Sequence, residues 1–219
     1  MRTRRRADLA ARAVAAAAVA GFVAGCPSTT VYRTADPVPP GRWQVGGALG
    51  VGAMRDFEQD GKLPIGHVEL WARRGVAPHV DVGAKLFVAG AQVDATWRVA
   101  RGRWSWAVAP SLAAARTANT PGTVDAIHLF AGAAGIASRP LSRRWSVSVG
   151  PLAGWGLFWP RTGGHAQGLW LGGFAGAEAR LGARWRVAPE LSAYRVVAGE
   201  VPVAGAAVQL GAAVRYDLP

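Results

Sequence analysis

The chain has 219 residues, of which 51% are hydrophobic and only 17% charged, and its formal net charge at pH 7 is +12. This length suits one domain of barrel or sandwich type. The single cysteine excludes an intramolecular disulfide. A basic excess can indicate nucleic-acid binding, but the arginines lie mostly in predicted turns and form no basic helix, so we expect no nucleic-acid partner.

The start of the chain has the organisation of an export signal. Met1–Arg6 is a charged run, and Ala13–Gly25 is an apolar one. The apolar run is too short to cross a bilayer as a helix, which takes about 20 residues. Residues 1–25 are therefore predicted to be a signal peptide that is removed after export.

The predicted signal ends in VAGC, Val23–Cys26. This sequence resembles the lipobox of bacterial lipoproteins, and the resemblance implies that Cys26 becomes the first residue of the mature chain and carries lipid. Cleavage after Ala20, which would leave Cys26 as a lone thiol, is the alternative. Residues 26–41 are rich in Pro, Ser and Thr, so we expect an extended tether without helix after the lipidated cysteine.

Residues 42–219 alternate between apolar and small or polar side chains, as in Trp43–Val51, Val80–Val88 and Val208–Tyr216. A period of two is the pattern of β-strands. About ten runs of about 10–14 residues predict an all-β chain. The expected architecture is a single antiparallel up-and-down transmembrane β-barrel.

The face opposite the apolar one has too few charged residues for the water-exposed surface of a soluble protein. On several strands it consists of Gly, Ala and Ser, and the chain has only two lysines, Lys62 and Lys85. Such a face fits a narrow lumen, with the apolar face against lipid. We therefore expect a barrel in the bacterial outer membrane that contacts outer-membrane lipid. A soluble periplasmic barrel lipoprotein is the alternative.

Four tryptophans stand where predicted strands begin, after short turns that are mostly basic: Trp43, Trp104, Trp145 and Trp185. Tryptophan is favoured at the interface between membrane and water. The connections at the other strand ends are longer, and this asymmetry is typical of outer-membrane barrels, whose periplasmic turns are short. The four side chains are therefore predicted to form an aromatic rim on the periplasmic side.

The alternation also predicts which side chains face outward. Outward-facing residues are Leu86, Val147, Val187 and Leu210, and their inward-facing neighbours are Lys85, Ser146, Arg186 and Gln209. A shift of one residue would reverse every pair. An arginine at Val147 is accordingly expected to impair membrane assembly more than an arginine at Ser148.

The end of the chain carries a family resemblance. Gln209, Gly211, Val214 and Tyr216 occupy the polar, glycine, apolar and aromatic positions of the assembly signal of outer-membrane barrels, although Asp217, Leu218 and Pro219 follow the aromatic residue. The hairpin sequence from Glu69 to Leu86 is similar to hairpins of small bacterial outer-membrane barrels. The resemblance implies insertion by the barrel-assembly machinery.

Seven ionisable residues share the predicted inward face: His67, Glu69, Arg73, Asp81, Lys85, Asp94 and Arg98. We interpret them as a lumenal ion-pair network that locks the barrel. The alternatives are a pore lining, or catalysis by His67 oriented by Glu69. The sequence shows no spacing typical of metal ligands or of phosphate-binding glycines, so no catalytic residue, metal or cofactor is predicted. The expected role is structural or narrow and porin-like, with a lipid-modifying barrel enzyme as the alternative.

Overall fold

The computed structural model describes residues 30–55, 62–117, 125–161, 163–200 and 205–218. The predicted signal peptide and Cys26 lie outside the described residues. Within the part of the chain that is described, no helix is long and apolar enough to cross a membrane.

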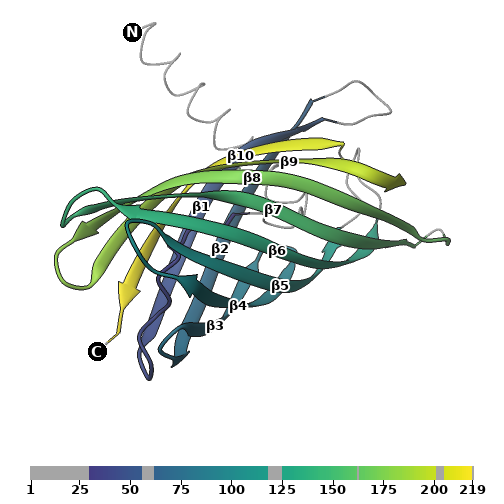
Figure 1. Ribbon diagram of the computed structural model, residues 1–219. Helices are drawn as coiled ribbons and strands as arrows, with labels where there is room; N and C mark the ends of the chain where they lie inside the picture. Colours follow the sequence, from purple (N-terminus) through teal and green to yellow (C-terminus); the bar gives the residue numbers. More distant parts are fainter. Residues whose placement is uncertain (1–29, 56–61, 118–124, 162, 201–204, 219) are drawn as a thin grey trace, which may run out of the picture.

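Ten strands form one closed barrel (Figure 1), in which each strand pairs with its neighbours in the sequence and β1 pairs with β10. Their bounds are β1 Trp43–Arg55, β2 Lys62–Ala77, β3 Val80–Phe87, β4 Gly90–Ala100, β5 Ser105–Thr117, β6 Ala126–Pro140, β7 Trp145–Pro160, β8 Ala166–Leu181, β9 Trp185–Glu200 and β10 Ala206–Asp217. The predicted fold class, an all-β antiparallel up-and-down barrel, is confirmed.

The barrel closes through the first and last strands. β1 and β10 pair antiparallel without a register shift, from Gln44 opposite Asp217 to Arg55 opposite Ala206. Closure leaves no unpaired backbone edge, which a transmembrane sheet requires because lipid offers no hydrogen-bond partners.

Side chains alternate between the inside and the outside as the sequence pattern predicts. Leu86 and Leu210 are 61% and 57% exposed, while the preceding Lys85 and Gln209 are 7% and 2% exposed. Buried Ser148 sets the same facing for β7, so Val147 points outward. The core of the molecule is therefore the lumen, and the apolar face is the outer surface.

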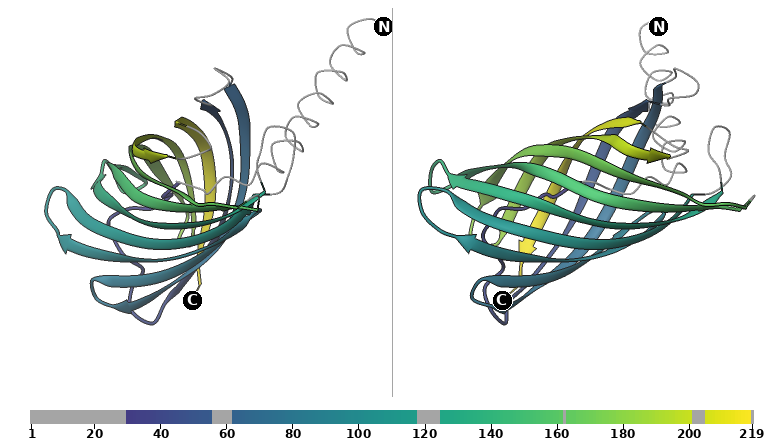
Figure 2. Two further views of the ribbon diagram at one scale, coloured as in Figure 1. Left: turned by 90° about the vertical axis from the view of Figure 1, so that its right-hand side faces the viewer. Right: turned by 45° about the vertical axis from the view of Figure 1, so that its right-hand side comes forward.

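The two ends of the barrel differ. The turn end, where β1 and the other odd-numbered strands begin, has short connections such as 101–104, 141–144 and 182–184. The wall is uneven in height, because β3 has 8 residues whereas β7, β8 and β9 have 16 each. Figure 2 shows the strongly tilted strands and the taller side of the wall.

Residues 30–41, the lumenal segment, run inside the barrel and reach β1 at the turn end. The sequence predicts an extended tether here, and the segment has no helix. It is nevertheless packed, because Tyr32 and Ala35 are 3% and 0% exposed. A short polar and proline-rich sequence favours an extended chain. The segment is buried because the barrel wall encloses it.

Candidate functional site

The wall of the barrel holds the lumenal segment by its backbone. Glu190 on β9 accepts hydrogen bonds from the backbone N–H groups of Val31 at 2.6 Å and Tyr32 at 2.5 Å. Ser138 on β6 accepts from the N–H of Ala35 at 2.8 Å. Further toward the turn end, a carboxylate oxygen of Asp81 on β3 accepts from the N–H of Val38 at 2.8 Å. These bonds satisfy backbone groups that a buried loop would otherwise leave without partners.

Apolar contacts hold the same segment against opposite walls. Tyr32 clusters with Ala48, Ala188 and Ala213, and its ring stacks on Trp71 with 6.1 Å between centroids. On the other wall, Ala35 clusters with residues of β5 to β8: Ala107, Ala109, Ala134, Ile136, Leu152 and Phe174. The segment therefore spans the lumen instead of lining one side of it.

Tyr32 has a backbone conformation that a tyrosine rarely adopts, with φ at 46°. A residue persists there only where its surroundings determine it. Here the N–H is held by Glu190, and the hydroxyl lies so close to Gly211 that a Cβ on that glycine would clash with the hydroxyl oxygen. The glycine of the predicted assembly signal thus also makes room for the lumenal segment.

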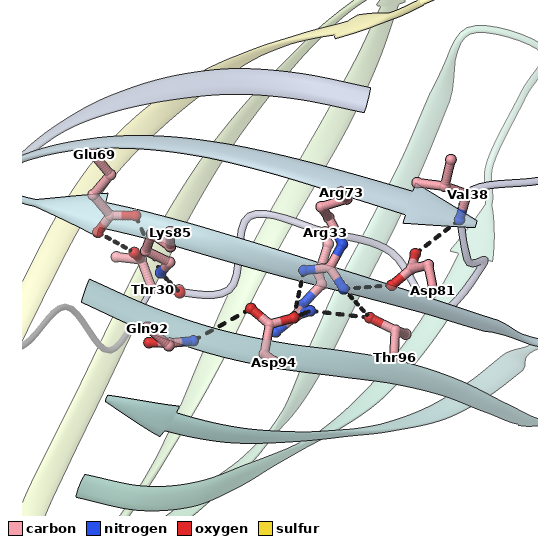
Figure 3. A network of polar contacts seen from close by, with 10 residues as sticks. All are labelled: Thr30, Arg33, Val38, Glu69, Arg73, Asp81, Lys85, Gln92, Asp94 and Thr96. Carbon is pink, nitrogen blue, oxygen red and sulfur yellow. Dashed lines mark hydrogen bonds and ion pairs between the residues drawn. The ribbon is translucent and has the colours of Figure 1, made fainter. Parts of the chain in front are cut away.

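One group of lumenal charges surrounds two arginines (Figure 3). Arg73 on β2 pairs with Asp81 and Asp94, and Arg33 of the lumenal segment pairs with the same oxygen of Asp94 at 2.7 Å. The hydroxyl of Thr96 lies 3.0 Å from a guanidinium nitrogen of each arginine. Both arginines and both carboxylates are almost fully buried, so the four charges compensate one another in a site with little water.

A second group lies deeper in the lumen (Figure 3). Lys85 pairs with Glu69 at 3.2 Å and donates to the backbone carbonyl of Thr30 at 2.8 Å. The hydroxyl of Thr30 donates to Glu69 at 2.7 Å. The Nε2 atom of His67 is 3.7 Å from Glu69 and 3.2 Å from the Tyr32 hydroxyl. The end of the lumenal segment is therefore bound to residues of β2 and β3.

The structure thus brings six of the seven predicted network residues into these two groups, and it places Arg98 apart from them. Arg98 lies near the turn end, where it pairs with Asp36 at 3.0 Å and approaches Nδ1 of His79 at 3.0 Å. All seven contact the lumenal segment or a partner of it. The lumenal segment is what links the two groups and Arg98.

Sequence reasoning missed several residues of the lumen. Glu178 and Glu190 are both 3% exposed and face inward on β8 and β9. Their positions could have indicated this, because each is an acidic residue in a strand of mostly small and apolar residues. Each also stands at an alternating position that faces inward. Tyr32 and Arg33 carried no signal, because nothing in an extended tether indicates that it folds into a barrel.

The geometry gives catalysis little support. His67 and Glu69 are 6% and 1% exposed, and neither lines the two lumenal cavities described below. A general base needs its substrate within hydrogen-bond reach, and here the neighbouring Tyr32 occupies that position. Among the described residues, no group of three or more His, Cys, Asp or Glu could hold a metal ion.

The four predicted rim tryptophans share the turn end. Trp43, Trp145 and Trp185 are the first residues of their strands and are 43%, 51% and 50% exposed, while Trp104 directly precedes β5. Trp185 packs on Tyr216 with 4.8 Å between ring centroids. The guanidinium carbon of Arg74 lies 5.5 Å from the ring centroid of Trp43. A belt of half-exposed indoles beside arginines is typical of a membrane interface.

Solved structures share this architecture. An outer membrane channel from Pseudomonas putida F1 superposes with a TM-score of 0.52 at 10% sequence identity, covering 89% of this chain and 100% of that chain. Neisserial surface protein A superposes with a TM-score of 0.50 at 11% identity, covering 80% and 97%. The chain has the fold of outer-membrane β-barrel proteins.

The other comparisons do not assign the chain to a family. No family model and no curated protein matches the chain. The outer membrane protease OmpT of Escherichia coli superposes with a TM-score of 0.47 at 6% identity, covering 84% of this chain and 100% of that chain. At such identities the similarity establishes the fold alone, so the function has to be argued from this chain's own lumen and surface.

Proposed function

We propose that this protein is an outer-membrane β-barrel, anchored by lipid on Cys26, whose lumen is closed by its own lumenal segment. Its role is structural, or that of a narrow transport path that conducts only when the segment moves. The fold, the outward apolar surface and the filled lumen support this proposal. A barrel of about eight strands is just wide enough for its own side chains, so a lumen of this size with a segment inside it leaves no wide channel.

The observation that carries the proposal is a ring of exposed apolar side chains around the closed barrel. Each strand contributes at least one large aliphatic residue that is between 42% and 65% exposed. One per strand, these are Leu49, Leu70, Leu86, Val93, Leu112, Leu129, Val149, Leu171, Leu191 and Leu210. A continuous apolar surface of this extent is unfavourable in water and is expected where acyl chains cover it.

An arginine in this ring should prevent stable insertion. Leu70, near the middle of β2, and Leu141, in the β6–β7 turn, are 62% and 60% exposed. We expect Leu70→Arg to cost about 2–4 kcal/mol near the middle of a bilayer, whereas Leu141→Arg should cost close to nothing near the interface. Folding yield into lipid vesicles, followed by heat-modifiable gel migration, measures the difference.

The two substitutions are matched in residue type and exposure, but Leu70 lies at mid-strand and Leu141 lies in a turn at the barrel end. In a soluble periplasmic barrel both would place a charge in water, and both variants would fold equally well without lipid. Equal folding yields of the two variants would therefore refute the membrane-spanning assignment and favour the soluble lipoprotein.

Lipid on Cys26 is tested separately, because the residue lies outside the described part of the chain. The lipobox sequence supports the attachment. We expect the wild-type protein to incorporate a fatty-acid probe during expression and Cys26→Ser to incorporate none, while both fold into the same heat-modifiable barrel. Persistent labelling of Cys26→Ser, or an unlabelled wild type, would contradict the anchor and leave the barrel assignment intact.

A further inference from the structure

Beyond this role, the turn-end mouth of the lumen contains a cavity of about 850 Å³, here called the vestibule. Its inner side is formed by the lumenal segment from Arg33 to Pro39, and its outer side by the rim of the barrel. A second cavity, of about 70 Å³, lies on the other side of the segment, and Arg33 lines both. The vestibule is large enough for a small-molecule ligand.

The vestibule is strongly cationic. The described residues that line it include nine arginines and three aspartates. The aspartates are already engaged: Asp81 by Arg73, Asp36 by Arg98, and Asp217 by Arg186 at 2.8 Å. Asp94 and Glu178 offset further arginines of the lining, but Arg42, Arg101, Arg139, Arg180 and Arg184 have no ion-pair partner within the described part of the chain. A mouth with an excess of one sign concentrates ions of the opposite sign.

Three of these arginines form a row across neighbouring strands. Arg180 on β8 lies opposite Arg186 on β9, and Arg186 lies opposite Arg215 on β10. Like charges directly opposite one another destabilise a sheet. Only two described carboxylates pair with this row: Glu178 with Arg186 and Arg215, and Asp217 with Arg186.

The arginines at this mouth have donor groups without an anionic partner, which a bound anion would supply. Arg215 is 4% exposed and lines the vestibule, and its Nε has no hydrogen-bond partner among the described residues. Arg180 has no carboxylate partner within the described part of the chain. Among the same residues, the guanidinium of Arg184 donates only to the Tyr216 hydroxyl, at 3.1 Å. Guanidinium groups in this arrangement match the planar and bidentate geometry of oxyanions.

We propose that the vestibule is a binding site for a phosphate-bearing anion, held by Arg180, Arg184 and the Arg186–Arg215 pair. The volume and the number of guanidinium groups favour an anion with more than one oxyanion group over a single small ion. A soluble polyphosphate and a phospholipid headgroup share this chemistry, and both can reach a mouth that opens at the rim of the barrel.

Calorimetric titration of the refolded protein in non-ionic detergent tests the site. The probes are inorganic pyrophosphate, for a soluble ligand, and dihexanoyl phosphatidic acid, for a lipid phosphate. We expect saturable binding of at least one probe, weakening with rising salt as the charges are screened. Preference for pyrophosphate identifies a soluble source, and preference for the phosphatidic acid identifies a lipid.

The double variant Arg180→Gln with Arg184→Gln should weaken binding about tenfold or more, because it removes two charge-assisted contacts without leaving a carboxylate unpaired. The matched control is Arg74→Gln with Arg103→Gln, which removes the same charge at the same end from two exposed residues that line neither the vestibule nor the neighbouring cavity shared by Arg143, Arg180 and Arg186. The control should bind within about twofold of wild type. Gel migration verifies that both fold. Absence of saturable binding of both probes to the wild type, or equal loss in the two double variants, would overturn the site.

Discussion

Deletion of residues 30–38 is expected to convert a barrel that does not conduct into one that does. The deleted residues are those that cross the lumen between Glu69 and Asp81. They carry Tyr32 and Ala35, which pack against opposite walls. Without them, the inward faces of the strands would line a water-filled path. In planar bilayers, the wild type should give no stepwise currents and the deletion variant should give them.

The deletion also removes partners of buried charges, so its folding has to be verified by heat-modifiable migration. A second variant keeps the segment and locks it. Ala35→Cys and Ser138→Cys place two thiols where the Ala35 N–H now meets the Ser138 hydroxyl at 2.8 Å. Combined with Cys26→Ser, they are the only cysteines of the chain.

The oxidised, locked variant should stay silent under all conditions in which the deletion variant conducts. If stepwise currents appear only after the disulfide is reduced, movement of the segment gates the path. A folded deletion variant with no more current than the wild type would show that the lumenal segment is not what closes the barrel.

Asp94→Asn is expected to destabilise the folded barrel by about 3–5 kcal/mol, because it breaks a buried ion pair from one side. The Asp94 carboxylate is 3% exposed and pairs with both Arg33 and Arg73. Arg73 would keep Asp81, but Arg33 would keep no carboxylate among the described residues. The free energy of unfolding in urea, measured in detergent or vesicles, reports the loss.

The chain offers a matched control in Asp125→Asn. Asp125 also bridges two arginines, Arg116 and Arg161, but these are 66% and 80% exposed and lie near the opposite end of the barrel. Exposed pairs contribute little because water and salt screen them. If Asp94 acts through Arg33, adding Arg33→Gln to Asp94→Asn should recover part of the lost stability. Equal unfolding midpoints for the two aspartate variants would contradict the buried network.

The filled lumen bears on one prediction from the sequence, which stays untested. The alternation predicts that Ser148 accepts an arginine more easily than Val147, because the inward face is made of small residues. Ser148 is 7% exposed, and its hydroxyl lies 2.8 Å from that of Ser138, which binds the lumenal segment at Ala35. An arginine at Ser148 would displace that segment, so small side chains on this face indicate a filled lumen here and not free space. Exposed leucines at different depths make the sharper comparison.

The strands and their facing can be predicted from the sequence alone. A period of two follows from the geometry of a single extended chain, so Leu86 outward and Lys85 inward could be predicted from alternation alone. The closed antiparallel order followed in turn, because an apolar surface without a free edge is what a strand-built membrane protein requires. The inward position of the charges from His67 to Arg98 could be read in the same way.

The partners of those charges follow from the three-dimensional arrangement and not from the strand pattern. That Arg33 reaches Asp94, that Glu190 holds the backbone of Tyr32, and that Gly211 accommodates its hydroxyl are contacts between segments far apart in the chain. No local pattern in residues 30–41 distinguishes a solvated tether from a segment inside a barrel, because both are extended and poor in helix formers. The difference arises when the closed wall excludes water and the buried charges and backbone groups must find partners within the lumen.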